Sequence, residues 1–404
     1  MTEYPYCALP FIHIKQFTNI AYAPCCEFEN KQYDTENGIS TAPQVNDVSL
    51  LDSWNHPHFQ NIRQEMIDGK IPKGCIRCKN REALGALTLR KAGWIPAVVK
   101  KRKLKLRTNL ELKDIRGLDL SFSNNCNMLC RMCQPEYSSK WVKIWDEFYG
   151  SVEHLNIGGY TKDAHAFSKN FDADVDKLTN LSYMKIQGGE PFLSKEHRKF
   201  ILSLPDEVIK NISFEYTTNT SIFPDKELFE KLVKAKFITV RCSVDGIGEL
   251  NEYIRTGVSW EQVNDTINKW ATEAAWRDNL FMFFSPCWQA LNVGALDDYV
   301  EFIRLLMKKH SQYIFLYSSY KIGCNRVLQP EPLSIWALPK KYKEKLIKKY
   351  SKEYPAWAVK TQLSVLGYLK DDKQIDTNSL IEFNNNFDSI ANIKKYDVLQ
   401  SALE

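Results

Sequence analysis

Three cysteines, Cys126, Cys130 and Cys133, lie close together in the chain with the spacing C-x3-C-x2-C. They directly follow a short apolar stretch at residues 118–122, which predicts a β-strand. Three thiolates on one loop can bind three irons of a [4Fe–4S] cluster and leave the fourth iron without a protein ligand. The spacing therefore predicts an iron–sulfur site whose open iron can take part in chemistry.

A second group of cysteines lies within the first 78 residues: Cys7, the adjacent Cys25 and Cys26, Cys75 and Cys78. Four of these thiols, with one taken from the adjacent pair, can form a metal site, and a small module with few apolar runs needs such a staple. Structural zinc accepts the same ligands as an iron–sulfur cluster, so spacing alone leaves both open. The remaining cysteines lack ligand spacing and are expected in the core: Cys242, Cys287 and Cys324.

The composition is that of an ordinary globular protein with room for two or three domains. Of its 404 residues, 44% are hydrophobic and 25% are charged, which suggests neither disorder nor a fibre. The net charge of +5 is mild and does not argue for a nucleic-acid partner. The start has no signal-peptide pattern, and no stretch approaches eighteen apolar residues. We therefore expect a cytoplasmic protein without a membrane partner, in which clustered cysteines hold metal.

After residue 113, short β-rich runs alternate with amphipathic helical stretches, which predicts βαβ units and a parallel sheet. The predicted strands cover residues 118–122, 183–187, 212–217, 238–244, 280–285 and 313–318. The predicted helices include residues 138–148, 196–204, 225–235, 260–274 and 296–308. Six such units fit an α/β fold of the partial (β/α)6 barrel type, in which the site lies at the carboxyl ends of the strands.

The sequence predicts four successive parts. Residues 1–95 form a small N-terminal metal-stapled module, in which Ser53 caps and starts a helix that runs to about Asp68. Residues 96–112 form a basic linker, and a solvated linker is favoured over a nucleic-acid contact for its run of lysines and arginines. Residues 113–330 form the barrel, and residues 331–404 form a C-terminal helical extension.

Polar or glycine-rich residues follow several of the predicted strands. Gly188, Gly189 and Glu190 follow the second strand, Asn219 lies after the third and Ser243 after the fourth. Each residue alone is common in turns. Because the carboxyl ends of parallel strands share one edge of the sheet, we expect these residues to lie on the same rim as the three-cysteine loop. This context disfavours a purely structural metal site or a coincidence for that loop.

These features together resemble the radical S-adenosylmethionine (SAM) superfamily. The match rests on the C-x3-C-x2-C loop after a first strand, on Gly-Gly-Glu-Pro after a second, and on the six-unit βα chain. The N-terminal cysteines resemble the auxiliary-cluster "twitch" region, which is related to the SPASM domain. Three further segments resemble twitch-containing radical enzymes: residues 253–257, 288–293 and 338–339. The resemblance covers most of residues 5–345 and leaves out the tail.

The resemblance implies roles for named residues. Cys126, Cys130 and Cys133 would hold a [4Fe–4S] cluster that binds S-adenosylmethionine and reductively cleaves it to a 5′-deoxyadenosyl radical, which abstracts hydrogen from a substrate. The methionyl ammonium would contact Gly188, Gly189 and Glu190, and candidates for the ribose and carboxylate are Asn219, Ser243 and Arg255. The family's glycine-containing motif for adenine on the fifth strand has no counterpart in this sequence. No catalytic side chain is assigned.

The resemblance also favours a second, auxiliary [4Fe–4S] cluster over zinc at the N-terminal cysteines, with Cys25 matching the family's ligand better than Cys26. It implies a reductant such as flavodoxin or ferredoxin as a partner. The expected substrate is a peptide or protein side chain, and a sugar or nucleotide is the alternative. An alternative of another class is a non-catalytic, metal-stapled RNA-binding protein.

Overall fold

The computed structural model describes these stretches of the chain: residues 7–16, 21–30, 35–36, 39–40, 42–43, 48–83, 88–91, 104–135, 137–150, 177–310 and 322–394. The chain divides into two compact units. The first consists of Met1–Asn124, Leu155–Glu215 and Lys226–Lys236, and the second of Asn125–His154, Tyr216–Asp225 and Phe237–Glu404. Among the described helices, none has the length and apolar character needed to cross a membrane.

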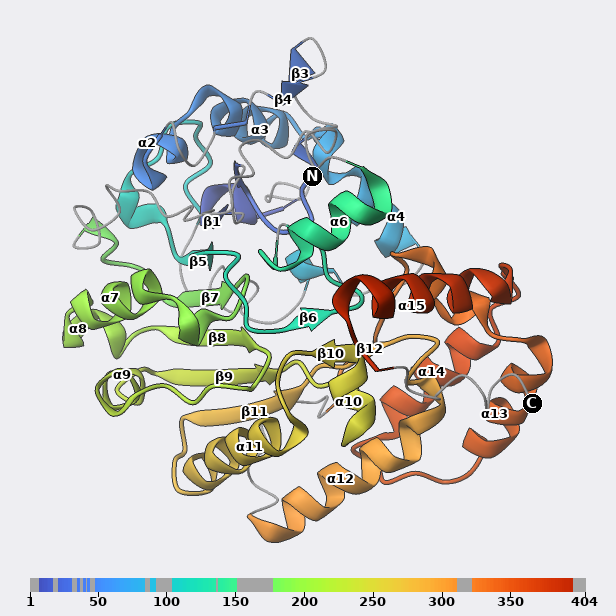
Figure 1. The fold of residues 1–404 in the computed structure, drawn as a ribbon. Helices are drawn as coiled ribbons and strands as arrows, with labels where there is room; N and C mark the ends of the chain where they lie inside the picture. The colour runs from blue at the N-terminus through green and yellow to red at the C-terminus, as the bar shows by residue number, and fades with distance from the viewer. Residues whose placement is uncertain are drawn as a thin grey trace. The chain divides into compact units, whose positions relative to one another are not determined.

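A mostly parallel sheet forms the centre of the first unit (Figure 1). Strand β5 (Gly117–Ser121) lies between β1 (His13–Gln16) and β7 (Tyr183–Gln187) and runs parallel to both. The short strand β2 (Tyr22–Ala23) pairs with β1 in the antiparallel direction. Alternate residues of β7 are buried, so one face of this strand packs on the apolar core.

The register of these strands places three charged side chains in a row across the sheet. Lys15 is opposite Asp119, and Asp119 is opposite Lys185. Lys15 Nζ lies 2.8 Å from Asp119 Oδ1, and both side chains are buried. Burial would raise the pKa of Asp119, but the two lysines hold it below its usual value. Parallel strands usually carry apolar residues on both faces, so charges in such a sheet need one another as partners.

Helices of the first unit start at residues suited to that position. Helix α3 (Pro57–Ile67) has a proline at its first position, where the missing N–H costs nothing. Helix α7 (Lys195–Ser203) follows Ser194, whose Oγ accepts a hydrogen bond from the His197 N–H at 3.1 Å. The other described helices and strands of this unit are α2 (Leu50–Trp54), α4 (Ile76–Ala83), α8 (Asp206–Ile209), α9 (Lys226–Leu232), β3 (Thr35–Glu36) and β4 (Ile39–Ser40).

The predicted helix from Ser53 to about Asp68 is wrong in its first part. The segment forms two helices, and Ser53 lies inside α2 instead of capping the longer helix. His56 separates them with an extended ψ of 145°. Pro57 explains the break, because a proline disfavours the helical conformation of the residue before it. The side chains that cap α2 and α3 are those of Ser49 and His56.

In the second unit, β9 (Phe237–Cys242) and β11 (Leu280–Phe284) pair in parallel. The connecting helix α11 (Trp260–Ala275) packs against β11, as in a βαβ unit. Strand β8 (Ser213–Thr218) runs from the first unit into the second. The other described elements before residue 330 are α6 (Trp141–Tyr149), α10 (Glu249–Ile254), α12 (Leu296–Lys309), β6 (Leu129–Cys130), β10 (Arg255–Thr256), β12 (Cys287–Trp288) and β13 (Asn325–Arg326).

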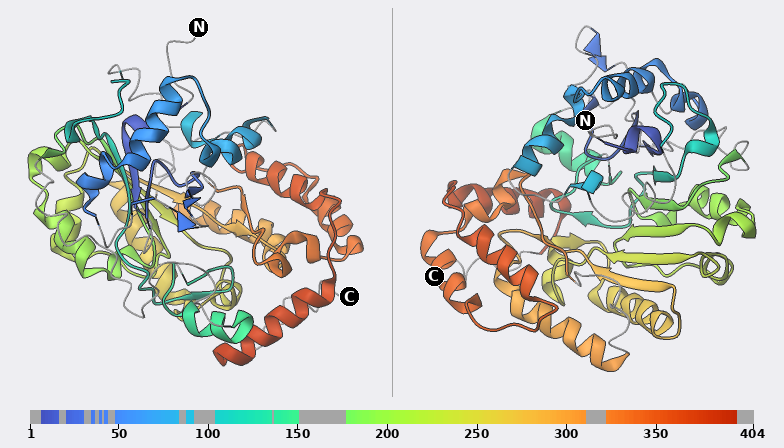
Figure 2. Two further views of the ribbon diagram at one scale, coloured as in Figure 1. Left: turned by 90° about the horizontal axis from the view of Figure 1, so that it is seen from above. Right: turned by 180° about the vertical axis from the view of Figure 1, so that it is seen from behind.

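The C-terminal part of the second unit is helical, as the sequence predicts. Helices α13 (Lys340–Tyr350) and α14 (Val359–Leu369) pack against one another and are coloured orange to red in Figure 2. Helix α15 (Thr377–Ala391) packs against α6. In this tail the sequence predicts helical fragments at residues 357–368 and 388–396, and α15 begins eleven residues before the second of them. The carboxylate of Asp376 caps α15 by accepting the Asn378 N–H.

The predicted α/β class with a mostly parallel sheet is confirmed. Five predicted strands correspond to β5, β7, β8, β9 and β11 within one or two residues at their ends. The sixth, at residues 313–318, lies outside the described residues, as do residues 96–103 of the predicted basic linker. The boundaries of the four predicted parts stay a prediction.

Candidate active site

The thiols of the three-cysteine loop lie near one another in the second unit. Cys130 ends the short strand β6, and the Cys133 N–H donates to the Cys130 carbonyl at 3.0 Å, which closes the loop. Burial and the neighbouring thiols of Cys130 and Cys126 raise the pKa of Cys133 well above its usual value. A bound cation reverses this effect, because it stabilises the thiolates. The donor set of three thiolates therefore fits an iron–sulfur cluster.

Two strands and one helix hold this loop in place. Strand β6 pairs with β10 in the antiparallel direction, with Cys130 opposite Arg255. The indole N–H of Trp141, in α6, donates to the Cys130 carbonyl at 2.7 Å. Gly257 has φ of 116°, and a Cβ at this position would lie 2.7 Å from the Asn127 carbonyl oxygen. Glycine is therefore required where β10 passes the loop.

Arg255 contacts the loop directly and is anchored by a buried carboxylate. Its Nη1 lies 3.5 Å from Cys130 Sγ, and its Nε lies 2.7 Å from Asp245 Oδ2. Burial would lower the pKa of Arg255, but Asp245 and Cys130 raise it above its usual value, so the guanidinium stays charged. The other oxygen of Asp245 accepts the Cys287 N–H at 2.7 Å. The site thus has a fixed positive charge beside a thiol.

Asn219 reaches the loop from the turn after β8. Its Nδ2 lies 2.8 Å from Asn127 Oδ1 and 3.7 Å from Cys126 Sγ. Its Oδ1 accepts the Ser221 hydroxyl at 2.6 Å, which fixes the amide. The intervening Thr220 is buried and has φ of 62°, a conformation that is strained for a β-branched residue. Such strain persists where neighbouring contacts fix the backbone, as at binding sites.

The other predicted cofactor residues lie at strand ends, as expected. Ser243 follows β9, and its N–H donates to the Thr218 carbonyl at 2.9 Å. Gly188 and Gly189 follow β7 in the first unit with φ of 88° and 51°, a region that favours glycine. Glu190 is almost fully buried, and its carboxylate accepts the Phe192 N–H at 3.2 Å. Their predicted contacts with a cofactor stay predictions.

Four N-terminal thiols line one pocket in the first unit: Cys7, Cys25, Cys75 and Cys78. Cys75 and Cys78 lie one helical turn apart where α4 begins. Cys26 is exposed and does not line the pocket. The structure thus distinguishes Cys25 from Cys26, a choice that spacing alone left open. Across the described residues, no group of three or more Cys, His, Asp or Glu side chains is arranged to hold a single metal ion.

Charged residues that the sequence did not single out border this pocket. Arg90 lines it, and Glu82 receives hydrogen bonds from Arg90 and Thr88. Cys78 Sγ lies 3.8 Å from Glu82 Oε1. Glu27 is a further lining residue and pairs with Arg81 at 2.6 Å. Hydrogen bonds and charges of this kind tune iron–sulfur clusters.

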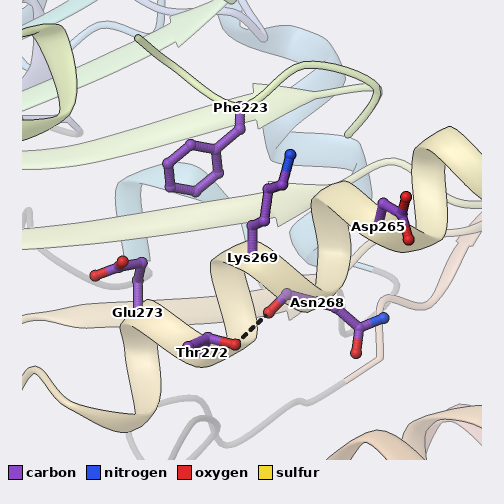
Figure 3. A pocket seen from close by; sticks show the side chains of 6 residues that line it. All are labelled: Phe223, Asp265, Asn268, Lys269, Thr272 and Glu273. Carbon is purple, nitrogen blue, oxygen red and sulfur yellow. Dashed lines mark hydrogen bonds between the residues drawn. The ribbon is translucent and has the colours of Figure 1, made fainter. Parts of the chain in front are cut away.

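A different pocket lies on helix α11 of the second unit (Figure 3). Lys269 extends toward Phe223, and the Thr272 hydroxyl donates to the Asn268 carbonyl at 2.9 Å within the helix. Asp265 and Glu273 complete the lining. The pocket contains none of the residues predicted to bind the cluster or its cofactor, so it is not the candidate active site.

Comparison with known families identifies the central part of the chain. Residues 120–283, which include the three-cysteine loop, Asn219 and Arg255, match the model of the radical SAM superfamily. This stretch is therefore similar to radical SAM domains. The predicted resemblance is confirmed at that level, and the radical SAM family implies a [4Fe–4S] cluster and S-adenosylmethionine as its cofactors.

Individual relatives are distant. The probable GTP 3′,8-cyclase of Methanocaldococcus jannaschii is 29% identical over 194 residues, which cover 48% of this chain and 56% of the relative. Among solved structures, anSMEcpe with bound AdoMet has 18% identity and a TM-score of 0.37, with 58% of each chain covered. Streptococcus suis SuiB bound to S-adenosylmethionine has 15% identity and a TM-score of 0.29, with 76% of this chain and 68% of SuiB covered.

Proposed function

We propose that this protein is a radical SAM enzyme that abstracts a hydrogen atom from its substrate. Cys126, Cys130 and Cys133 would hold the [4Fe–4S] cluster, and the cluster with S-adenosylmethionine supplies a 5′-deoxyadenosyl radical when both are bound. The observation that carries the proposal is that polar side chains surround the three-cysteine loop within the stretch that matches the radical SAM model. Asn219 and Arg255, which come from separate elements, both reach the cysteine thiols.

Each polar residue has a task that its chemistry suits. Arg255 keeps a positive charge beside Cys130, which offsets the negative charge of bound thiolates. Asn219 and Ser243 would offer hydrogen bonds to the ribose, and the backbone at Gly188 and Gly189 with the Glu190 carboxylate would take the methionyl ammonium. Cys126 and Cys130 are buried, whereas Cys133 is partly exposed.

Anaerobic reconstitution tests this function. We expect about seven to eight irons per chain, the sum of two cubane clusters, and 5′-deoxyadenosine on reduction with S-adenosylmethionine. Iron content and product are measured by colorimetric assay and by liquid chromatography with mass spectrometry. A protein that takes up zinc in place of iron, or a fully iron-loaded protein that forms no 5′-deoxyadenosine, contradicts the proposal and favours the non-catalytic alternative.

For the substrate, we propose a peptide or protein side chain, with a nucleotide as the second candidate. One observation favours the nucleotide: the Methanocaldococcus relative is described as a probable GTP 3′,8-cyclase.

The two substrate classes are separated by the same assay. The reconstituted protein is supplied with nucleoside triphosphates in one series and with a peptide pool in another. A substrate that binds beside the cofactor promotes its turnover, so the matching class should raise 5′-deoxyadenosine formation several-fold over the rate without substrate. Stimulation by nucleotides alone overturns the peptide assignment, and stimulation by peptides alone overturns the nucleotide.

We further propose that the N-terminal pocket holds an auxiliary [4Fe–4S] cluster through Cys7, Cys25, Cys75 and Cys78. The convergence of the four thiols on one pocket supports this assignment. Full ligation by four thiolates leaves no open iron, so this cluster would transfer electrons or stabilise the first unit.

The adjacent cysteines provide a matched test of the auxiliary site. Cys25→Ala should lose about four of the roughly eight irons, because it removes a thiol of the pocket, whereas Cys26→Ala should keep nearly all of them. Iron analysis and the iron–sulfur absorbance of the two purified variants give the comparison. The assignment fails if Cys26→Ala loses the iron and Cys25→Ala retains it, or if both behave like the wild type.

A further inference from the structure

A buried arginine, Arg131, lies between Cys130 and Cys133 in the sequence of the three-cysteine loop. Arg131 is fully buried, and its guanidinium stacks on the ring of Tyr253, 3.7 Å from the centroid, and on the ring of Phe387 at 4.6 Å. Its Nε donates to the Tyr253 carbonyl at 2.9 Å. A guanidinium is costly to bury, so every partner that it finds constrains where the loop can lie.

The charge of Arg131 is balanced by the C-terminal helix α15. Its Nη2 donates to Asp388, and its Nη1 lies 3.0 Å from Asn384 Oδ1. The hydroxyl of Tyr253 donates to the other oxygen of Asp388 at 3.0 Å. Asn384 and Asp388 are four residues apart and so share one face of the helix. That face presents two acceptors to a single side chain of the loop.

A second chain of contacts links the same helix to the loop backbone. The rings of Phe387 and Trp141 have centroids 5.6 Å apart, and the Trp141 indole holds the Cys130 carbonyl at 2.7 Å. Helix α15 therefore supports both the side chain of Arg131 and, through Trp141, the backbone of the cysteine before it. α15 lies outside the residues matched by the radical SAM family model, which end at 283.

We infer that α15, through Asp388, positions the three-cysteine loop for cluster binding, and that Arg131 and Asp388 are its positioning residues. This inference rests on the proposed function, because it assumes that the loop binds iron. Residues remote from the thiols can set their spacing, since packed and hydrogen-bonded partners fix the geometry of a metal site. The tail would then be a working part of the cluster site.

The test compares two variants on α15. Asp388→Asn removes the charge that balances Arg131, whereas Glu382→Gln makes the same chemical change at an exposed position of the helix. After anaerobic reconstitution, Asp388→Asn should lose about two to four irons per chain, up to the content of one cubane. Any cluster that still forms in the three-cysteine loop should show a broadened, shifted EPR signal that responds weakly to S-adenosylmethionine. Glu382→Gln should match the wild type in both measurements.

Further measurements distinguish positioning from general destabilisation. Asp388→Asn should keep the iron of the N-terminal site. This iron is measured by combining Asp388→Asn with Cys126→Ala/Cys130→Ala/Cys133→Ala, which removes the ligands of the other cluster. If Asp388→Asn does not fold, Asn384→Leu removes one acceptor without leaving a charge unbalanced and should give a smaller effect of the same kind. The inference is overturned if these variants bind iron and S-adenosylmethionine like the wild type, or if they lose both clusters together. Failure of the wild type itself to bind iron would instead contradict the proposed function.

Discussion

The variant Cys126→Ala/Cys130→Ala/Cys133→Ala should form no 5′-deoxyadenosine and should retain about four irons per chain, half of the wild-type content. The loss of product is expected because these three thiolates would be the only protein ligands of the cluster whose fourth, open iron binds S-adenosylmethionine. The retained iron would belong to the N-terminal pocket, whose four thiols lie in the other compact unit. Iron analysis and chromatographic detection of 5′-deoxyadenosine measure both quantities in one preparation.

Cys324→Ala is the matched control, because it removes a half-buried thiol to which neither site assigns a role. It should keep the full iron content and the wild-type rate. A triple variant that loses all of its iron would show that the two sites are coupled or wrongly assigned. A triple variant that still forms 5′-deoxyadenosine would exclude the loop as the place of SAM cleavage.

The central strands and the site around the cysteines could be predicted because their signals are local. Strand β7 matches the predicted residues 183–187, where buried and half-buried residues alternate along the sequence. Asn219 was expected on the same rim as the three-cysteine loop, and its amide lies 3.7 Å from Cys126 Sγ. For Asn219 the reason is general: residues after parallel strands meet at one edge of the sheet.

Contacts between distant segments could not be predicted in the same way. Arg131 and Asp388 are 257 residues apart in the chain, and a charged residue between two cysteines carries no sign of its partner. Helix α15 begins before the predicted helical fragment at residues 388–396, although its run Asn384–Asn386 has low helix propensity. The buried side chains of Leu380, Phe383 and Phe387 stabilise this helix through packing, which overrides propensity.

Asp245 is a site residue that sequence reasoning located but did not assign. It follows the predicted fourth strand, two residues after Ser243, and the sequence gives no reason to choose it as the partner of Arg255. The structure adds that reason, because Asp245 is fully buried and its carboxylate pairs with the guanidinium at 2.7 Å. A buried carboxylate needs such a partner. Its burial would have been the useful signal, and burial depends on the complete fold.

Arg255→Gln should lower the reduction potential of the cluster in the three-cysteine loop by up to about 130 mV. The guanidinium donates to Cys130 Sγ at 3.5 Å, and a hydrogen bond from a charged group contributes about 1.5–3 kcal/mol. Reduction makes the cluster more negative, so the positive charge favours the reduced form. Its removal therefore lowers the potential, by about 59 mV for each factor of ten in the equilibrium of a one-electron couple. An EPR-monitored redox titration gives the value.

Asp245→Asn should shift the same potential upward, because it removes a negative charge while leaving the side-chain shape nearly unchanged. Arg255→Gln should also cost about 3–5 kcal/mol of stability, since it leaves Asp245 buried without its partner. Thermal unfolding of Arg255→Gln, Asp245→Asn and the variant with both changes measures this loss of stability separately from the change in reduction potential. Arg304→Gln, which breaks an exposed pair with Glu301, is the control and should leave the potential unchanged. Shifts of the same sign in Arg255→Gln and Asp245→Asn would rule out a charge effect, because two opposite charges at one site cannot act on the cluster in the same direction.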